Sequence, residues 1–535
     1  MIPSSSMPDL TAASRSVGVA RAALDTTIDH LAAGGPDALE VHQVVAYDLA
    51  HAAAAMEGAR VAVDYGTHGE AEARIACAFV ADSIADLAAR IAGRDEAWGL
   101  PAGALGGALS EVAQYRDPAW LAELAGMSGP RHLDNDFELV QETFRRFAEE
   151  RIAPVAEAIH RENTDIPESI ISGLAELGAF GLSIPEEYGG FASGGESDYL
   201  GMVVATEELS RASLGAGGSL ITRPEILARA LVRGGTEAQK RHWLPRLASG
   251  EVMAAVAVTE PDFGSDVAGV TVSASSLGDG GWVINGTKTW STFAARADVL
   301  MLLARTDPDR SLGHRGLSLF VVEKERADGH GFSFAQPGGG RLEGRPIDTI
   351  GYRGMHSYEL SFDGWKIPAD SLVGGDKGLG RGFYLQMEGF ENGRLQTAAR
   401  AVGVMQAAFE AASKYAADRV VFGHPIGRYQ LSQVKLARMA VHIAVGRQYM
   451  YQVARLMAKG EGALEASMVK AYVCRSAEWV TREAMQLHGG MGYAEEYPVS
   501  RYFVDARVLS IFEGADETLA LKVIARRLLE RAGMH

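Results

Sequence analysis

The chain has 535 residues, more than one hydrophobic core usually serves, so several domains are expected. Its 47% of hydrophobic and 22% of charged residues are typical of a globular protein and argue against a disordered chain. The formal net charge of −17 argues against a nucleic-acid-binding protein, because neutralising phosphates requires clustered Lys and Arg.

The sequence also predicts no membrane span, because no apolar run reaches the roughly 18 residues that cross a bilayer. The two cysteines, Cys77 and Cys474, lie far apart in apolar runs, which is typical of buried thiols in a reducing compartment. The Ser-rich first residues include Asp9 and few basic residues, unlike a transit peptide. These features favour a cytoplasmic location.

The first part of the chain, residues 1–130, is predicted to be an all-helical segment. Alanine is frequent there, and apolar residues recur every three or four positions. Glycine-rich breaks at 34–36 and 66–69 separate the expected helices. A second helical part, residues 131–251, begins with a helix at Asn135, where Asn or Asp can cap.

The pattern changes at Val252, where short apolar strands replace helical spacing up to about residue 374. The expected strands cover 252–258, 299–304, 317–322 and 357–362, and Asn285-Gly286 within 282–288 predicts a hairpin turn. Helical spacing resumes and continues from 375 to 535. Helices, then a sheet, then helices predict an α+β fold with segregated layers.

The N-terminal segment contains one internal similarity to the C-terminal helices. Residues 69–83 align without gaps on residues 462–476, and Phe79 falls on Tyr472. Chance similarity between alanine-rich helices explains this as well as a degenerate duplication does. Both readings stay open at the level of the sequence.

Short motifs in a fixed order carry the functional information. They are Thr259-Glu260-Pro261-Asp262-Phe263-Gly264-Ser265-Asp266, Trp290-Ser291-Thr292, Gln486-Leu487-His488-Gly489-Gly490 and Ile511-Phe512-Glu513-Gly514. Together they resemble the acyl-CoA dehydrogenase family over roughly residues 133–529. The resemblance implies an N-terminal helical domain (131–251), a middle β-barrel-like sheet domain (252–374) and a C-terminal four-helix bundle domain (375–535), with 1–130 as an addition.

The implied reaction removes hydrogens from the α and β carbons of an acyl-CoA thioester. Glu513 matches the family glutamate that abstracts the α-proton, and Gly514 would let the substrate come close. The hydride from the β carbon needs a two-electron acceptor, which the resemblance identifies as FAD. Taken alone, Glu513 equally suits a carboxylate at a helix start.

The resemblance spreads the FAD-binding residues over distant segments. The strand and turn along the flavin ring match Val256, Val258, Thr259, Gly264 and Ser265, and the covering segment matches Trp290, Ser291 and Thr292. Residues that would act across a dimer interface are Arg419, Phe422, Gln430, Gln486, Leu487, Gly489 and Gly490, and the loop after the base adds Ala515 and Glu517. Taken singly, Trp290 on a strand is equally typical of a core residue, and Arg419 on a helix is equally typical of a solvent-exposed charge.

The substrate side is carried by fewer residues. Ser265, Gly514 and Arg394 match positions near the CoA and the thioester, and Arg223 and Arg353 are candidates for binding a distal carboxylate. With its added N-terminal segment the chain resembles the members of this family that act on (2S)-methylsuccinyl-CoA, which implies this substrate and mesaconyl-CoA as product. Ala515, Phe293 and Phe512 depart from the usual family residues, which puts acyl selectivity and flavin potential in doubt.

The expected partners are electron-transfer flavoprotein and a second copy of the chain. If the N-terminal segment is a degenerate copy of part of the C-terminal helical bundle, it could pack where a second dimer sits in tetrameric relatives, leaving a homodimer; a homotetramer is the alternative. An acyl-CoA oxidase, another short-chain dehydrogenase and a non-catalytic flavin or acyl-CoA scaffold also remain open. No metal site is expected, because His424 and His488 lack partners at ligand spacing.

Overall fold

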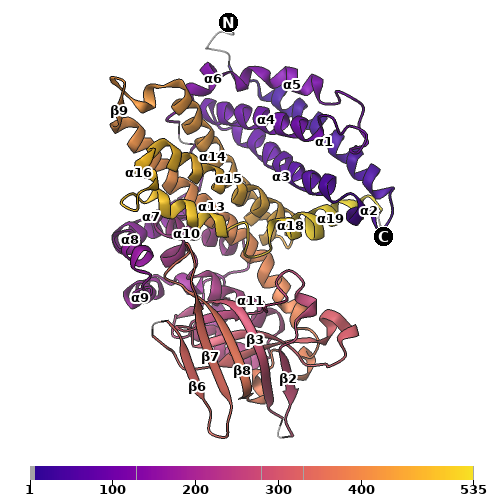
Figure 1. The fold of residues 1–535 in the computed structure, drawn as a ribbon, viewed down its shortest axis with the longest axis vertical. Helices are drawn as coiled ribbons and strands as arrows, with labels where there is room; N and C mark the ends of the chain where they lie inside the picture. The colour runs from indigo at the N-terminus through magenta and orange to yellow at the C-terminus, as the bar shows by residue number, and fades with distance from the viewer. Residues whose placement is uncertain (1–6, 128, 279, 329, 534–535) are drawn as a thin grey trace. The chain divides into compact units, whose positions relative to one another are not determined.

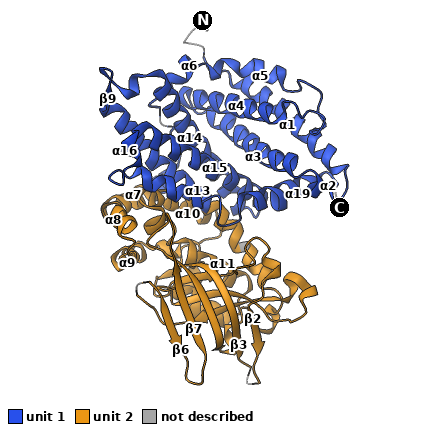
Figure 2. Cartoon of the chain, in the orientation of Figure 1, with its two compact units in different colours: residues 1–138, 397–535 blue, residues 139–396 orange. Residues whose placement is uncertain are grey.

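The computed structural model describes residues 7–127, 129–278, 280–328 and 330–533. The chain divides into two compact units, one formed by 1–138 with 397–535 and the other by 139–396 (Figure 2). The first unit therefore joins the two ends of the chain. The earlier division at residues 130, 251 and 374 stays a prediction.

The N-terminal segment is helical, as its alanine-rich pattern predicts. Asp9 caps the first helix by accepting a hydrogen bond from the Ala12 amide at 2.9 Å. The breaks at 34–36 and 66–69 fall between helices. The helices are α1 (Leu10–Ala32), α2 (Ala38–Val41), α3 (Gln43–Gly66), α4 (Glu70–Ile91), α5 (Gly106–Val112) and α6 (Pro118–Ala122).

The C-terminal part of the same unit is also helical (Figure 1). Its long helices α14 and α15 form an antiparallel hairpin through the turn at 459–462. The helices are α13 (Gly382–Asp418, of which 397–418 belong to this unit), α14 (Gln430–Ala458), α15 (Ala463–His488), α16 (Gly490–Tyr493), α17 (Val499–Val508), α18 (Asp516–Thr518) and α19 (Arg526–Arg531).

The N-terminal hairpin α3–α4 packs directly on the C-terminal hairpin α14–α15. Phe79 of α4 and Tyr472 of α15 meet edge to face, with ring centroids 5.5 Å apart. These are the two residues that the internal alignment places at equivalent positions. Contact between equivalent positions is the arrangement that a pseudo-twofold axis between two similar hairpins produces.

The second unit begins with helices and ends in the first turns of α13. The Asp134 side chain, rather than Asn135, caps α7, accepting from the Phe137 amide at 3.2 Å. The helices are α7 (Asn135–Phe147, entering this unit at 139), α8 (Ala153–Glu162), α9 (Glu168–Glu176), α10 (Ser197–Ala212), α11 (Thr222–Gly234) and α12 (Glu237–Ala248), with a π-helical turn at Leu214–Gly218.

The sheet of this unit follows the order β1-β4-β2-β3-β8-β7-β6, with β5 paired to β4. Both faces of β4 are buried: Met301 packs with α11 and α12, whereas Leu300 packs in a cluster with Phe320 and Trp365. The strands are β1 (Ala254–Ala257), β2 (Ser273–Ser276), β3 (Trp282–Thr292), β4 (Val299–Arg305), β5 (Leu317–Glu323), β6 (Phe332–Ala335), β7 (Arg341–Ile347) and β8 (Ser357–Ile367).

The hairpin turn predicted at Asn285-Gly286 is wrong. The residues lie inside the continuous strand β3, where the register with β8 shifts between Ile284 and Gly286. Gly286 has φ +125°, and a Cβ there would lie 2.9 Å from the Val272 side chain. The glycine thus allows a β-bulge within the strand and close packing on its neighbour.

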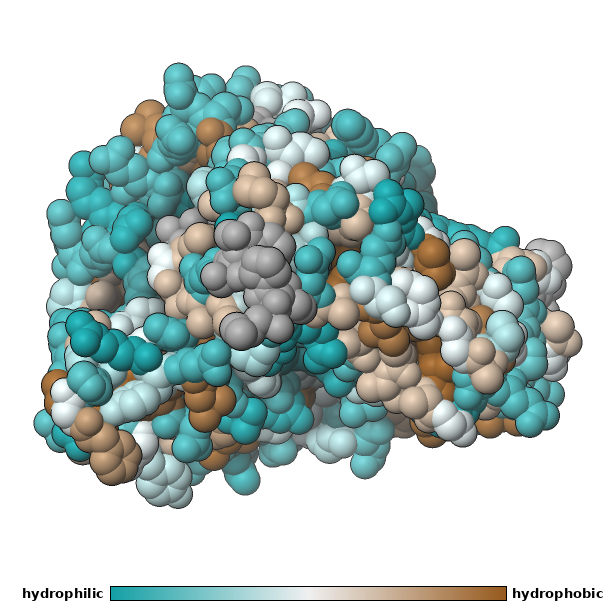
Figure 3. All heavy atoms as spheres, turned by 90° about the horizontal axis from the view of Figure 1, so that it is seen from above, coloured by the Kyte–Doolittle hydropathy of each residue, from teal (hydrophilic) through white to brown (hydrophobic). Residues whose placement is uncertain are grey.

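The predicted α+β fold class is confirmed, with a curled sheet lying between two helical stretches in sequence (Figure 1). On the face drawn in Figure 3, hydrophobic residues lie in several separate areas among hydrophilic ones, as on an ordinary protein surface. Among the described residues, no helix is both long and apolar enough to cross a membrane.

Candidate functional site

The loop between α17 and α18 carries Glu513 in an unusual backbone conformation. Its φ is +54°, in the left-handed region that non-glycine residues rarely occupy, and Gly514 follows with φ +99°. Such strain costs on the order of 1–3 kcal/mol and persists only where surrounding contacts fix the backbone. The Glu513 side chain is half-buried.

Buried cations on two helices fix this loop. Lys470 of α15, which is 1% exposed, donates from Nζ to the Gly514 carbonyl at 2.6 Å. The fully buried Arg400 of α13 places its guanidinium 4.7 Å from the centre of the Phe512 ring. Together they hold the residues on each side of Glu513.

The N-terminal segment holds the same loop from its other end. Tyr47 of α3 donates to Asp516 Oδ2 at 2.5 Å, and His51 Nε2 lies 3.2 Å from that oxygen. Burial raises the pKa of Asp516, but His51, Tyr47 and Arg475 outweigh it and lower the pKa to about 2. Asp516 is therefore ionised at neutral pH and fastens α18 to α3.

Ser510, Ile511 and Ala515 of this loop also border a cavity of about 310 Å³. Its lining is formed by Tyr47, Arg475, Glu478, Arg507, Ser510, Ile511, Ala515, Asp516 and Glu517. The predicted FAD-binding residues Ala515 and Glu517 are thus brought next to α3 of the N-terminal segment. The sequence gives no sign of the contact between Tyr47 and Asp516, because these residues are 469 positions apart.

A second group of predicted residues lies at the far end of the α13–α15 helices. Phe422 forms the tip of a tight hairpin with φ +52° and is 92% exposed. Tyr415, one turn before Arg419, stacks on His488 with ring centroids 4.3 Å apart, which joins this hairpin to the loop after α15. Also at the surface there are Arg419, Gln430, Gln486, Gly489 and Gly490, with Leu487 half-buried.

These two groups are separated along α15. Lys470 of this helix contacts the Glu513 loop, and Gln486, a member of the other group, follows 16 residues further along the same helix. At 1.5 Å per residue, that separation is about 24 Å. One chain therefore does not bring all the predicted FAD-binding residues of this unit to one place.

The unit formed by 139–396 brings together the other predicted FAD-binding segments. The Thr289 amide donates to the Thr259 carbonyl at 2.8 Å, which joins the end of β1 to β3. The next residue, Trp290, has φ +57°, sits in a bulge of β3 and is 55% exposed. Bulges re-aim side chains, and this one turns an indole outward. Val258, Ser291 and Thr292 are buried, Val256 and Thr259 half-buried, and Gly264 and Ser265 exposed.

A buried ion pair stabilises this junction. Lys288 is fully buried and donates to Val258 O and to Glu260 Oε1, both at 2.8 Å. Glu260 also accepts from the Thr271 and Val272 amides. Burial lowers the pKa of Lys288 to about 8, although Glu260 opposes the shift. The sequence offered one signal: alternation in β3 puts Lys288 on the inward face with Ile284.

The stretch of small residues at 213–223, which ends at the predicted substrate-binding residue Arg223, is closely packed. A Cβ on Gly215 would lie 2.2 Å from the Arg353 carbonyl oxygen, and one on Gly218 would lie 1.8 Å from Ser210 Oγ. The small residues of 213–223 therefore allow backbone packing. Arg223 is 7% exposed, and its Nη2 lies 3.3 Å from the Tyr352 hydroxyl.

The two other arginines of this region differ in setting. Arg353 donates to the carbonyls of Thr349 and His160 at 3.0 and 2.9 Å, so two of its nitrogens already join backbone segments. Arg394 lies on α13 and is half-buried.

The residues fit a bound flavin. The buried Ser291 Oγ has no hydrogen-bond partner among the described residues, directly beside the outward-facing Trp290. A polar atom left unpaired at such a position is typical of a site that a ligand completes. Trp290 also offers a broad aromatic face to a planar ring.

Known proteins share this architecture. The acyl-CoA dehydrogenase N-terminal, middle and C-terminal domain families match residues 134–251, 255–365 and 380–529. The chain is 47% identical over 423 residues to (2S)-methylsuccinyl-CoA dehydrogenase of Cereibacter sphaeroides, covering 78% of this chain and 73% of that one.

Two solved structures are similar throughout their length. A glutaryl-coenzyme A dehydrogenase in complex with glutaryl-CoA has a TM-score of 0.68 and 32% identity, covering 76% of this chain and 97% of that chain. Butyryl-CoA dehydrogenase from Megasphaera elsdenii has a TM-score of 0.67 and 30% identity, with coverages of 74% and 99%. The chain therefore belongs to the acyl-CoA dehydrogenase family, whose members are FAD-dependent oxidoreductases.

Proposed function

We propose that this enzyme oxidises (2S)-methylsuccinyl-CoA to mesaconyl-CoA, with Glu513 as the base that removes the α-proton. The observation that carries the proposal is the fixed loop at Glu513, whose strained backbone is held by Lys470, Arg400 and Asp516. The choice of substrate is supported by the 47% identity to a methylsuccinyl-CoA dehydrogenase. This reaction would place the enzyme in the ethylmalonyl-CoA pathway.

The chemistry assigns separate tasks to the residues. Glu513 takes the α-proton on a carboxylate oxygen, and the rigid loop keeps that oxygen in one position. Trp290, Ser291 and Thr292 with Val256 to Ser265 would hold the flavin ring of FAD, which when bound supplies the acceptor for the hydride from the β carbon. Ser265, Arg394 and Gly514 would contact the CoA and the thioester.

A dicarboxylic substrate needs a cation opposite its far end. Arg223 is proposed for this role, because a buried guanidinium can bind a carboxylate with two hydrogen bonds. Tyr352, 3.3 Å from the guanidinium, would hold it in place. Arg353 is proposed instead to join two backbone segments through its hydrogen bonds to the Thr349 and His160 carbonyls.

We further propose a homodimer that passes electrons to electron-transfer flavoprotein. The distance of about 24 Å along α15 suggests that residues near Arg419 and Gln486 serve the partner's FAD. The hairpin α3–α4, packed on α14–α15, would cover the surface through which dimers pair in tetrameric relatives. A cytoplasmic location stays a prediction from the sequence.

The substrate proposal is tested by steady-state assays of the purified holoenzyme with methylsuccinyl-CoA, butyryl-CoA, isovaleryl-CoA and glutaryl-CoA. We expect the highest kcat/KM with methylsuccinyl-CoA. In Arg223→Gln, the KM for methylsuccinyl-CoA should rise by about 10-fold or more, whereas that for butyryl-CoA should change little. A higher kcat/KM of the wild type with butyryl-CoA or isovaleryl-CoA, whose acyl chains are uncharged, would refute the proposal that methylsuccinyl-CoA is the substrate.

The same assays separate a dehydrogenase from an oxidase. With substrate in air and no added acceptor, a dehydrogenase should form little hydrogen peroxide, and adding electron-transfer flavoprotein should restore turnover. Stoichiometric peroxide at the full rate of turnover would instead identify an acyl-CoA oxidase.

A further inference from the structure

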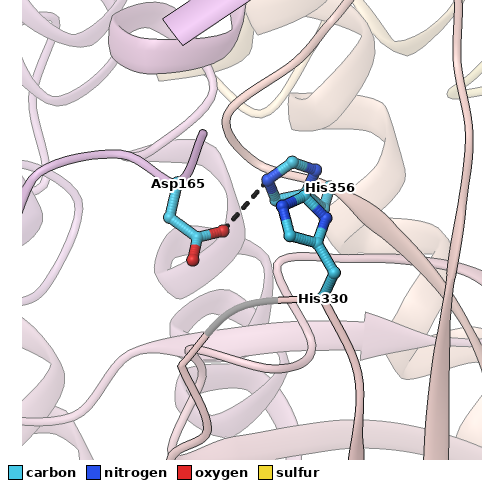
Figure 4. A group of neighbouring side chains, drawn as sticks. All are labelled: Asp165, His330 and His356. Atoms are coloured by element: carbon cyan, nitrogen blue, oxygen red, sulfur yellow. Dashed lines mark ion pairs between the residues drawn. The ribbon is translucent and has the colours of Figure 1, made fainter. Parts of the chain in front are cut away.

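Three side chains from separate parts of the 139–396 unit converge outside the proposed active site. Asp165 lies in the loop between α8 and α9, His330 in the connection between β5 and β6, and His356 directly before β8. Figure 4 shows the carboxylate of Asp165 pointing at the two imidazole rings. One ligand atom from each residue lies within 4.8 Å of the other two.

The distances within this cluster suit a small cation. His356 Nε2 and Asp165 Oδ1 are 3.0 Å apart, and the two imidazole centroids are 4.5 Å apart in an edge-to-face arrangement. Two ligands bound to zinc at about 2.0 Å in tetrahedral geometry lie about 3.3 Å from each other. Asp165 and His330 are both exposed, which leaves their side chains room to rotate towards an ion.

His356 shows that the cluster is incomplete without a further group. The residue is 7% exposed, and its Nε2 makes no hydrogen bond within the described residues although Asp165 Oδ1 is near. The two atoms lie 3.0 Å apart, close enough to bind one common cation. A cation between the two atoms turns this contact into two favourable bonds.

The backbone holds His356 in place before any ion binds. His356 has φ +44°, and its carbonyl accepts from the Phe293 amide at 2.8 Å. Arg353 fastens the same segment to the His160 carbonyl of α8. A Cβ on Gly354 would lie 2.8 Å from Ile159, so the segment packs tightly against α8. These contacts limit the rearrangement that binding would need.

We propose that Asp165, His330 and His356 bind a divalent transition-metal ion, for which Zn²⁺ is the best match. Two imidazoles and one carboxylate are a ligand set that suits zinc and disfavours magnesium and calcium, which require oxygen ligands. Water would complete the coordination at the exposed side. The bound ion would tie the α8–α9 loop and the β5–β6 connection to the start of β8.

This proposal departs from the sequence-based expectation of no metal site. Short ligand spacings reveal zinc sites in sequences, but here the three ligands are separated by 165 and 26 positions. Only the fold brings them together. None of the three ligands is Glu513 or a predicted FAD-binding residue, although the His356 carbonyl accepts from the Phe293 amide, directly after Thr292.

The test is a calorimetric titration of the chelator-treated holoenzyme with Zn²⁺, paired with Co²⁺ absorption spectroscopy. We expect one Zn²⁺ per chain and Co²⁺ bands between about 500 and 650 nm that report nitrogen ligands at low coordination number. Asp165→Asn and His330→Ala should each weaken Zn²⁺ binding by more than about 100-fold, since losing an outer partner of a ligand already costs about 10- to 100-fold. Both positions are exposed, so these variants should fold.

A similar group elsewhere in the chain provides the control. His68 stacks on His132, which contacts Glu72 at 2.7 Å, but this group does not converge on one point as the first does. His68→Ala should leave Zn²⁺ affinity unchanged. Absence of stoichiometric Zn²⁺ binding by the wild type, or equal affinity in Asp165→Asn, His330→Ala and the wild type, would overturn the proposal.

Discussion

Backbone strain marks three of the residues that matter most. Glu513, Trp290 and Phe422 all have positive φ without being glycine. Trp290 and Phe422 expose their side chains and Glu513 is half-buried, and contacts to neighbouring strands or helices fix the backbone around Trp290 and Glu513. Residues in this conformation cluster at functional sites because the strain fixes a side chain in one direction.

The residue that anchors the Glu513 loop gives a direct prediction. Lys470→Met leaves the Gly514 carbonyl without its donor, and a buried acceptor left unpaired costs about 1–3 kcal/mol. If that cost is expressed as misplacement of Glu513, substrate-driven flavin reduction should slow by about 10-fold or more. Anaerobic stopped-flow absorbance measures this rate.

The matched control for that variant is Lys435→Met. Lys435 pairs with Glu483 in the same helical bundle and has no contact with the loop among the described interactions. The Lys435→Met variant should lose some stability but reduce its flavin at the wild-type rate. An unchanged rate in Lys470→Met would show that this lysine does not position the base.

At the scale of elements, the pair Lys288–Glu260 joins β1 to β3. Lys288→Met leaves Glu260 charged, buried and without its lysine, which should cost about 3–5 kcal/mol in free energy of unfolding. The double variant Glu260→Gln with Lys288→Met should recover most of that loss. Chemical denaturation measures all three proteins, and a double variant no better than the single one would contradict the pairing.

The same lysine predicts a pH dependence. Because the pKa of Lys288 is lowered to about 8 in the fold, the unfolded chain binds more protons between about pH 8 and 10.5. The free energy of unfolding should therefore gain a contribution that rises with pH in this window. That contribution should be absent from Lys288→Met.

How far the sequence predicts these elements depends on the range of the interactions. Strong helical spacing and mostly apolar strands such as β4 and β5 are visible in the sequence, because their pattern is local. The strands β2, β6 and β7 were missed: β2 is Ser-Ala-Ser-Ser, β6 is short, and β7 contains a glycine and a proline. The hairpin turn predicted at Asn285-Gly286 is wrong because a β-bulge and a hairpin turn both favour glycine with a positive φ.

The candidate site shows the same limit. Motifs point to Glu513 and Trp290, whereas the two lysines that hold those segments, Lys288 and Lys470, belong to no motif, although alternation in β3 places Lys288 on the inward face. Their roles come from contacts across 28 and 44 positions, which no local pattern encodes.

At the scale of the whole molecule, the first 130 residues belong to the same compact unit as the C-terminal helices. Tyr47→Phe tests this dependence. It removes a hydrogen bond to Asp516 and should cost about 1 kcal/mol at neutral pH. Because the pKa of Asp516 is about 2 in the fold and near 3.8 unfolded, its stabilisation is present above about pH 4 and lost as pH falls towards 2.

Tyr47→Phe should raise the pKa of Asp516 and so flatten the pH dependence of stability in that range. Denaturation midpoints measured between about pH 2 and 5 report the effect. Tyr65→Phe is the control, because Tyr65 donates to the Pro130 carbonyl and not to a carboxylate. It should lower stability without changing the pH dependence; equal pH profiles for the wild type and Tyr47→Phe would contradict the role of Asp516.

The most direct measurement of the whole account is the anaerobic bleaching of flavin absorbance by methylsuccinyl-CoA in wild type and Glu513→Gln. The variant should keep its flavin and its thermal midpoint, since glutamine preserves the size of the side chain. Its rate of flavin reduction should fall by at least about 100-fold, because a positioned base contributes about 10²- to 10⁴-fold. Reduction at the wild-type rate would contradict the assignment of Glu513 as the base.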